Sequence, residues 1–132
     1  MVSYRLIRLF FSTERMHIMV IIEAIIKPFK LDDLKEAVEE IGVGGLTITE
    51  VLQTSEIQTR RRPTGATDLG PDYVPKIQVE IAVAVELAER VIEAICLHAS
   101  AGRTEDGIIV VTRMEGAVRI RTGEQGADAL MP

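Results

Sequence analysis

Cysteine, tryptophan and aromatic residues in general are scarce in this sequence. Among 132 residues there are one cysteine, no tryptophan, three phenylalanines and two tyrosines. The single thiol, Cys96, cannot form an internal disulfide or a thiolate metal cluster, which is typical of a protein of the reducing cytoplasm. Too few aromatic side chains are present for the stacking platforms that bind single-stranded nucleic acids. The core must therefore consist of aliphatic residues, and a hydrophobic content of 47% suits one compact domain.

An excess of positive charge and long apolar runs are lacking as well. The formal net charge is −5, which disfavours a broad basic surface for DNA or RNA. No stretch of about 20 apolar residues occurs, so we expect no transmembrane helix and no direct insertion into a membrane. The histidines are His17 and His98, and no carboxylates cluster at ligand spacing. We therefore expect no metal site.

The first 18 residues differ in character from the rest of the chain. They mix three arginines with short apolar pairs, and they have neither the long apolar core nor the small-residue cleavage site of a signal peptide. Met16 and Met19 are alternative starts. Residues 1–18 are expected to be a start-site artefact or an extension without fixed structure, and a short amphipathic docking segment is the alternative. We expect one domain, residues 19–132.

The first half of this domain shows a strand, a helix and a second strand. Residues 19–26 form an apolar run interrupted only by a glutamate, which is typical of a buried strand. From residue 31, apolar residues recur at helical spacing until the glycines at 42, 44 and 45. Residues 46–52 then alternate between apolar and polar, which predicts a strand.

The second half repeats this order after a long loop. Residues 53–74 have almost no apolar periodicity, and a loop of this length in a small domain usually has a function. Residues 76–84 alternate as a strand with one apolar face, and residues 86–99 carry a helical apolar stripe. Residues 108–111 and 117–121 are predicted to be short strands joined by a turn.

This order of elements predicts an α+β fold. The expected architecture is a ferredoxin-like βαββαβ sandwich, with a four-stranded antiparallel sheet and both helices on one face. The other face of the sheet is also rich in isoleucine and valine. Such a face usually finds a partner, so we expect the sheets of several copies to associate.

Three separate blocks of the sequence resemble one family. The segments EAIIKPFKLDDLKEAVEEIGVGGLTITEV (23–51), PKIQVEI (75–81) and VRIRTGE (118–124) are similar to PII nitrogen-regulatory proteins in one ungapped register from about residue 19 to 124. The resemblance implies a homotrimer with nucleotide clefts between its subunits. It also implies that the long loop is a T-loop, which docks onto a membrane transporter, a metabolic enzyme or a regulator.

The resemblance also implies an effector site. Thr47 matches the threonine that holds adenine, and Lys76 matches the loop-base lysine that holds the 2-oxoglutarate carboxylate. Arg119 and Arg121 match the paired arginines with which a neighbouring subunit grips phosphate, and on a strand both would point to one face. Solvated surface side chains are the alternative for Thr47 and for the two arginines. The phosphate-contacting turn is matched by Gly102, Arg103, Asp106 and Gly107.

Several positions depart from the family pattern. At the loop base, Gln53 and Ser55 replace glycines whose backbone amides approach phosphate. Ile57 stands in place of a glutamine that helps to coordinate magnesium, and an isoleucine cannot be a ligand. In the phosphate turn, Glu105 replaces a glycine and Ile108 a lysine. These changes disfavour Mg-ATP with 2-oxoglutarate and favour ADP or AMP, which demand less of the missing lysine and magnesium ligand.

The long loop itself has also changed. Leu69 occupies the position of the family's modified tyrosine, and leucine has no hydroxyl group to accept a uridylyl group. The run Arg60-Arg61-Arg62 is either a solvated loop tip or a contact for an anionic partner surface. We assign Arg60, Arg61, Arg62 and Leu69 to the partner-contacting loop.

No catalytic motif is visible in the sequence, so a regulator and not an enzyme is expected. The predicted effector is an adenine nucleotide (ADP, AMP or ATP), and no tightly bound cofactor is expected. One alternative is an effector-independent interaction trimer of the copper-tolerance-like fold. Others are an ordinary nitrogen sensor that binds ATP and 2-oxoglutarate, and a weak phosphohydrolase that acts on a bound nucleotide.

Overall fold

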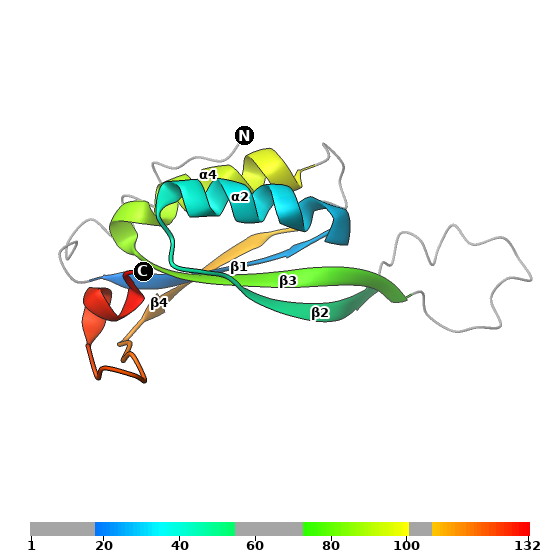
Figure 1. The fold of residues 1–132 in the computed structure, drawn as a ribbon. Coiled ribbons are helices and arrows are strands. Elements are labelled where there is room, and N and C mark those ends of the chain that lie inside the picture. The colour runs from blue at the N-terminus through cyan, green and yellow to red at the C-terminus, as the bar shows by residue number, and fades with distance from the viewer. Residues whose placement is uncertain (1–17, 55–72, 101–106) are drawn as a thin grey trace, which may run out of the picture.

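One antiparallel sheet with the strand order β2-β3-β1-β4 forms the centre of the molecule, and two helices cover one of its faces (Figure 1). The computed structural model describes residues 18–54, 73–100 and 107–132. This arrangement confirms the predicted ferredoxin-like sandwich. The elements are β1 (Met19–Ile26), α2 (Leu31–Ile41), β2 (Thr47–Thr54), β3 (Tyr73–Ala84), α4 (Val85–Ala99) and β4 (Ile109–Met114), with short 3-10 helices η2 (Pro28–Lys30) and η4 (Gly126–Leu130).

The two central strands have the most regular alternation in the sequence. In β1, and in β3 from Ile77 onward, every second residue points to the helices and is buried, because successive strand side chains point to opposite faces. The residues between them lie on the face that carries no helix, which we call the open face, and most are half-buried. The buried set on the helix side is Val20, Ile22, Ala24, Ile26, Ile77, Val79, Ile81 and Val83.

The two helices complete the core from one side. In α2, Leu34 and Val38 are fully buried, and Asp32 and Asp33 lie in the first turn, where the helix dipole favours negative charge. Gly42 ends α2 in the left-handed conformation, with a φ of 98°. The buried residues of α4 are Val85, Ala88, Val91, Ile92, Ala94 and Ile95. Within the described ranges, no helix is long and apolar enough to cross a membrane.

The strands next to the long loop are longer than expected. β2 continues to Thr54 and β3 begins at Tyr73, so each strand takes in two residues of the predicted loop 53–74. Register explains this extension, because Gln53 and Thr54 pair with Val74 and Tyr73 in the same ladder as the residues before them. The interior of the loop lies outside the described residues, as does the extension up to residue 17.

The predicted strand 117–121 is wrong. β4 runs from Ile109 to Met114 and already pairs with β1, which completes this edge of the sheet. Residues 117–125 instead form a narrow turn, which we call the arginine turn. The amide of Arg119 donates to the Glu124 carbonyl (2.8 Å), and the amide of Gly123 donates to the Arg119 carbonyl (2.8 Å). A φ of 75° at Gly123 favours glycine at this reversal.

The C-terminal segment, residues 126–132, folds back onto the body of the protein. Its 3-10 helix η4 contacts β3, and its last residues approach the connection between α2 and β2. A Cβ on Gly44 would lie 3.4 Å from the Leu130 carbonyl oxygen and 3.7 Å from the Pro132 Cα. The C-terminal segment therefore lies close to position 44, where a Cβ would make ordinary van der Waals contacts with it.

Candidate functional site

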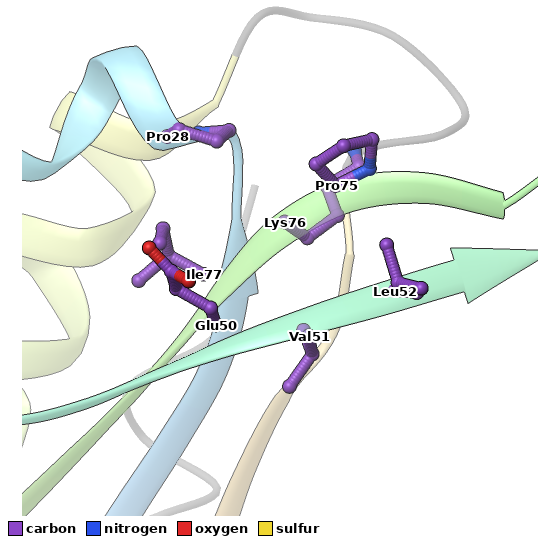
Figure 2. A pocket seen from close by; sticks show the side chains of 7 residues that line it. All are labelled: Pro28, Glu50, Val51, Leu52, Pro75, Lys76 and Ile77. Carbon is purple, nitrogen blue, oxygen red and sulfur yellow. The ribbon is translucent and has the colours of Figure 1, made fainter.

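A hollow lies where β2 and β3 approach the long loop (Figure 2). It has a volume of about 420 Å³, which is large enough for a small organic ligand. Its wall is mainly aliphatic, with the cation of Lys76 and the carboxylate of Glu50 as its charged groups. The side chains that line it are Pro28, Glu50, Val51, Leu52, Pro75, Lys76 and Ile77.

Thr47 lies outside this hollow. It begins β2 and pairs with Glu80 of β3, so it lies on the open face of the sheet. Lys76 pairs with Val51 on the same face but nearer to the long loop. The two expected ligand residues therefore share one face of the β2–β3 pair.

Gly107 shows why a glycine precedes β4. A Cβ at this position would lie 3.0 Å from the carbonyl oxygen of Ile25, a tight contact that only a small shift of this carbonyl would relieve. Ile108, the next residue, has 78% of its surface exposed. An apolar side chain thus meets solvent where the family pattern has a lysine. The other predicted members of this turn, Gly102, Arg103 and Asp106, lie outside the described residues, as do Arg60, Arg61, Arg62 and Leu69.

Arg119 is held by the protein's own C-terminal segment. Its Nη2 donates to the carbonyl oxygens of Asp128 (3.3 Å), Ala129 (3.4 Å) and Met131. Its Nε lies 3.5 Å from Oε1 of Glu124. That separation suffices for an ion pair, although the Nε is buried without an aligned hydrogen bond. Only 27% of the Arg119 side chain is exposed.

Arg121 has a different environment. It lies in the arginine turn and is exposed, and within the part of the chain that the structure describes no residue bonds to its guanidinium. Since residues 119–121 form a turn and not a strand, the expectation that both arginines point to one strand face is wrong. The backbone reverses between them, and Ile120 at the tip is fully exposed.

Lys76 and the two arginines lie at opposite ends of the sheet. The stretch of β3 from Lys76 to Ala84 spans about 26 Å at roughly 3.3 Å per residue. β4 ends at the Ala84 level, because Met19 pairs with both Ala84 and Met114. The arginine turn comes after this point, away from the Thr54 and Tyr73 ends of β2 and β3 (Figure 1). One chain therefore does not bring these cations together.

A pair of carboxylates on the open face was not expected from the sequence. Glu23 of β1 pairs directly with Glu80 of β3. A hydrogen bond to Glu80, aided by partial burial and by the negative charge of Glu80, raises the pKa of Glu23. The available signal was the single glutamate in the apolar run 19–26, but its partner depends on strand register. In residues 18–54, 73–100 and 107–132, no three histidine, cysteine or acidic side chains gather as metal ligands.

Comparison with known sequences gives a consistent result. The model of the family described as "Nitrogen regulatory protein P-II" matches residues 19–124. The nitrogen regulatory protein P-II of Bradyrhizobium diazoefficiens is 45% identical over 109 residues, which are 83% of this chain and 97% of that protein. The P-II protein of Rhizobium meliloti is 47% identical over the same number of residues, again 83% of this chain and 97% of that protein.

Solved structures show the same fold. Arabidopsis thaliana PII bound to citrate has a TM-score of 0.69 and 29% identity, and the match covers 86% of this chain and 92% of that one. A GlnK–ATP complex of B. subtilis has a TM-score of 0.68 and 24% identity, and the match covers 86% of this chain and 96% of that one. Both are similar to the present chain along nearly their whole length.

Proposed function

Because the chain belongs to the nitrogen regulatory protein P-II family, we propose that it is a trimeric regulator that binds an adenine nucleotide between its subunits. The family consists of trimeric regulatory proteins that act on partner transporters and enzymes. Effector binding in this chain would change the conformation of the long loop and so control a partner protein. Regulation requires no catalytic groups, and the role proposed here is binding alone.

The observation that supports a shared cleft is the separation of Lys76 from Arg121. A nucleotide cleft that contains Arg121 and adjoins the loop-base Lys76 cannot form within one chain, since the two residues lie at opposite ends of the sheet. In a ring of identical subunits, each contact joins two different surfaces, so one end of a chain meets the other end of its neighbour. Lys76 of one subunit and Arg121 of the next would then face the same ligand.

Exposed apolar side chains support this head-to-tail contact. Val110 of β4 and Val118 of the arginine turn are 44% and 63% exposed. At the opposite edge of the sheet, Ile48 and Leu52 of β2 are exposed as well. Burial of such side chains is the usual source of assembly energy. A contact between the β4 edge of one chain and the β2 edge of the next would cover both sets.

ADP or AMP fits the cleft better than Mg-ATP. Ile108 presents an exposed apolar side chain in place of the family's lysine, so one phosphate-binding cation is missing. Gln53 in β2 adds a side chain where the family's glycine leaves room for phosphate. Fewer phosphates require fewer cations, and the free Arg121 suffices for a short phosphate chain.

Calorimetry with AMP, ADP, ATP, cyclic AMP and 2-oxoglutarate tests this proposal. We expect AMP or ADP to bind, and 2-oxoglutarate to bring no increase in affinity for Mg-ATP. If no nucleotide binds to the trimer, the nucleotide proposal is wrong. Tight, synergistic binding of Mg-ATP and 2-oxoglutarate would instead make the protein an ordinary nitrogen sensor. Light scattering on the same samples measures whether the protein is a trimer.

The partner is proposed to be a membrane transporter or a metabolic enzyme or regulator, bound through the loop that contains Arg60, Arg61, Arg62 and Leu69. Replacement of the three arginines by alanine should weaken binding to the purified partner protein that the wild-type chain binds, because an anionic surface would lose three cationic contacts. Biolayer interferometry gives the two affinities. Equal affinities would remove the arginines from the contact, and a Leu69→Ala chain serves as the uncharged comparison.

A further inference from the structure

The outer surface of helix α4 carries one exposed stripe along most of its length. In the helix layer that covers one face of the sheet (Figure 1), this stripe is on the side away from the sheet. Four residues form it at a spacing of four, three and four positions, namely Glu86, Arg90, Glu93 and Leu97. That spacing places them on one side of a helix. We call this stripe the α4 ridge. Two carboxylates flank one guanidinium in it, and the apolar Leu97, which is 73% exposed, ends it.

The helix layer around this ridge is negatively charged. α2 and α4 contain eight acidic and two basic residues, which is a net charge of −6, whereas the whole chain has −5. The two helices pack against each other, so their charges lie on one surface. The last turn of α2 contains no basic residue, although the helix dipole makes that end negative. This surface therefore attracts a cationic segment.

The N-terminal segment, residues 1–17, has the complementary charge and joins the described structure beside the ridge. Its charged residues are Arg5, Arg8, Glu14 and Arg15. The carbonyl of the buried Ile18 accepts a hydrogen bond of 2.9 Å from the amide of Val85, the first residue of α4. Three residues of chain span at most about 10 Å. Arg15, three residues before Ile18, is therefore within reach of the first turn of α4.

The spacing of residues in this segment matches that of the ridge. Tyr4, Arg8, Phe11 and Arg15 are separated by four, three and four positions, so in a helix they would lie on one side. Such a helix, antiparallel to α4, would have the same rise per residue as α4 and would stay in register with it. The facing pairs would be Arg15–Glu86, Phe11–Arg90, Arg8–Glu93 and Tyr4–Leu97. Two pairs join opposite charges, one places a guanidinium on an aromatic ring, and one is apolar.

We propose that residues 1–17 dock along the α4 ridge of their own chain, held by the pairs Arg15–Glu86 and Arg8–Glu93. Exposed ion pairs are individually weak. The connection at Ile18 compensates for this, because a short tether gives an effective concentration on the order of millimolar. A helix of about twelve residues is marginal alone in water, so this one would form only as it packs. The nucleotide cleft takes no part in this contact, which does not depend on the proposed function.

Trypsin cleavage after Arg5 measures docking, because the protease cuts the segment only while it is released. Arg5 lies outside the four facing pairs, so this cleavage site is present in every variant below. At low salt, the full chain should be cut at least about threefold more slowly than the free peptide of residues 1–17. The difference should shrink in about 0.5 M salt, which screens exposed charges. A full chain cut as fast as the peptide at low salt overturns the proposal.

Charge reversal tests the register. Glu86→Arg together with Glu93→Arg should accelerate cleavage by about threefold to tenfold, because two ion pairs become repulsive. Addition of Arg8→Glu and Arg15→Glu to that chain should restore slow cleavage, with each chain compared to a free peptide of its own sequence. Absence of this rescue overturns the proposed pairs. If the reversed chain does not fold, Glu86→Gln with Glu93→Gln should accelerate cleavage in the same direction.

The matched control lies on the neighbouring helix. Glu36→Arg together with Glu40→Arg makes the same change in charge at exposed positions of α2. It should accelerate cleavage far less than the change on the α4 ridge, because it leaves the four facing pairs intact. An equal acceleration would mean that net charge alone attracts the segment, and it would overturn docking on the ridge.

Two measurements distinguish the other fates of the segment. The intact mass of the chain expressed from its own gene gives the first residue, and a chain that starts at Met16 or Met19 overturns the proposal because it lacks the arginines. Vesicles that contain phosphatidylserine test a membrane as the docking surface. We expect slow cleavage without vesicles. Protection that appears only when vesicles are added would assign the segment to a membrane and overturn docking on α4.

Discussion

Glu23 and Glu80 are paired on the open face of the sheet. No lysine or arginine lies in the same row of paired residues across the strands. The four residues in this row across the sheet are Thr47, Glu80, Glu23 and Val110. A hydrogen bond between the carboxyl groups needs a proton on one of them, which is why the pKa of Glu23 is raised above its ordinary value of 4.5. Above the raised pKa of Glu23 the pair has lost this proton and the two carboxylates repel each other.

The difference in the pKa of Glu23 between the folded and the unfolded state determines whether stability rises or falls with pH. A carboxyl whose pKa is higher in the folded state than in the unfolded state binds its proton more tightly when folded. Its contribution to stability is complete below the ordinary pKa of 4.5, and it is lost as the pH rises through the raised pKa of Glu23. The pair therefore favours the folded state below the raised pKa of Glu23 and not above it.

Glu80→Gln should remove this dependence. Glutamine donates a hydrogen bond without a proton equilibrium, so Glu23 no longer needs to be protonated. Melting temperatures at about pH 5 and about pH 8 should differ less in the variant than in the wild type, and the gain should lie at the higher pH. Glu93→Gln, on the exposed face of α4, is the matched control. An equal change in both variants would assign the effect to net charge alone.

At the scale of elements, the sequence predicts what hydrophobic periodicity controls. The bounds of β1 were predicted as observed, and α2 begins and ends where Leu31 and Gly42 indicated. α4 begins one residue earlier than predicted. These elements bury one face each, and that face repeats at the period of a strand or a helix. Hydrophobic periodicity was sufficient to predict these elements because the core consists of their buried faces.

The arginine turn shows where periodicity misleads. Val118 and Ile120 alternate with Arg119 and Arg121, which is the pattern of a half-buried strand. In the chain these two apolar side chains are exposed, and the backbone is held instead by bonds around Gly123. An apolar residue that packs on another subunit leaves the same sequence pattern as one that packs on its own sheet. Sequence alone does not distinguish the two.

The site was predictable only in part for a related reason. Family blocks identified the residues, and their roles at Thr47, Lys76 and Gly107 stay predictions. The hydrogen bonds between Arg119 and the C-terminal segment form because this segment folds back onto the body of the protein, and no local sequence pattern predicts that path. The Glu23–Glu80 pair likewise depends on register between strands that are more than 50 residues apart in sequence.

At the scale of the whole molecule, the groups proposed to adjoin the ligand lie at opposite ends of the described chain. Its hollow and Lys76 lie at one end, and its free Arg121 lies at the other. A trimer with head-to-tail contacts would bring each end to the opposite end of a neighbour. Every cleft would then belong to two chains, and every chain would take part in two clefts.

A cleft formed by residues of two chains would have a genetic consequence. Chains with Lys76→Ala and chains with Arg121→Ala should each bind ADP more weakly than the wild type as pure trimers, because each change removes one cation from every cleft. When they are unfolded and refolded together, each mixed trimer contains a cleft with an intact lysine from one chain and an intact arginine from the next. ADP binding of wild-type strength, measured by calorimetry, should therefore reappear in the mixture. If the two defects do not complement each other, both residues serve a cleft within the same chain. Complementation would also let one defective allele rescue another in a cell that carries both.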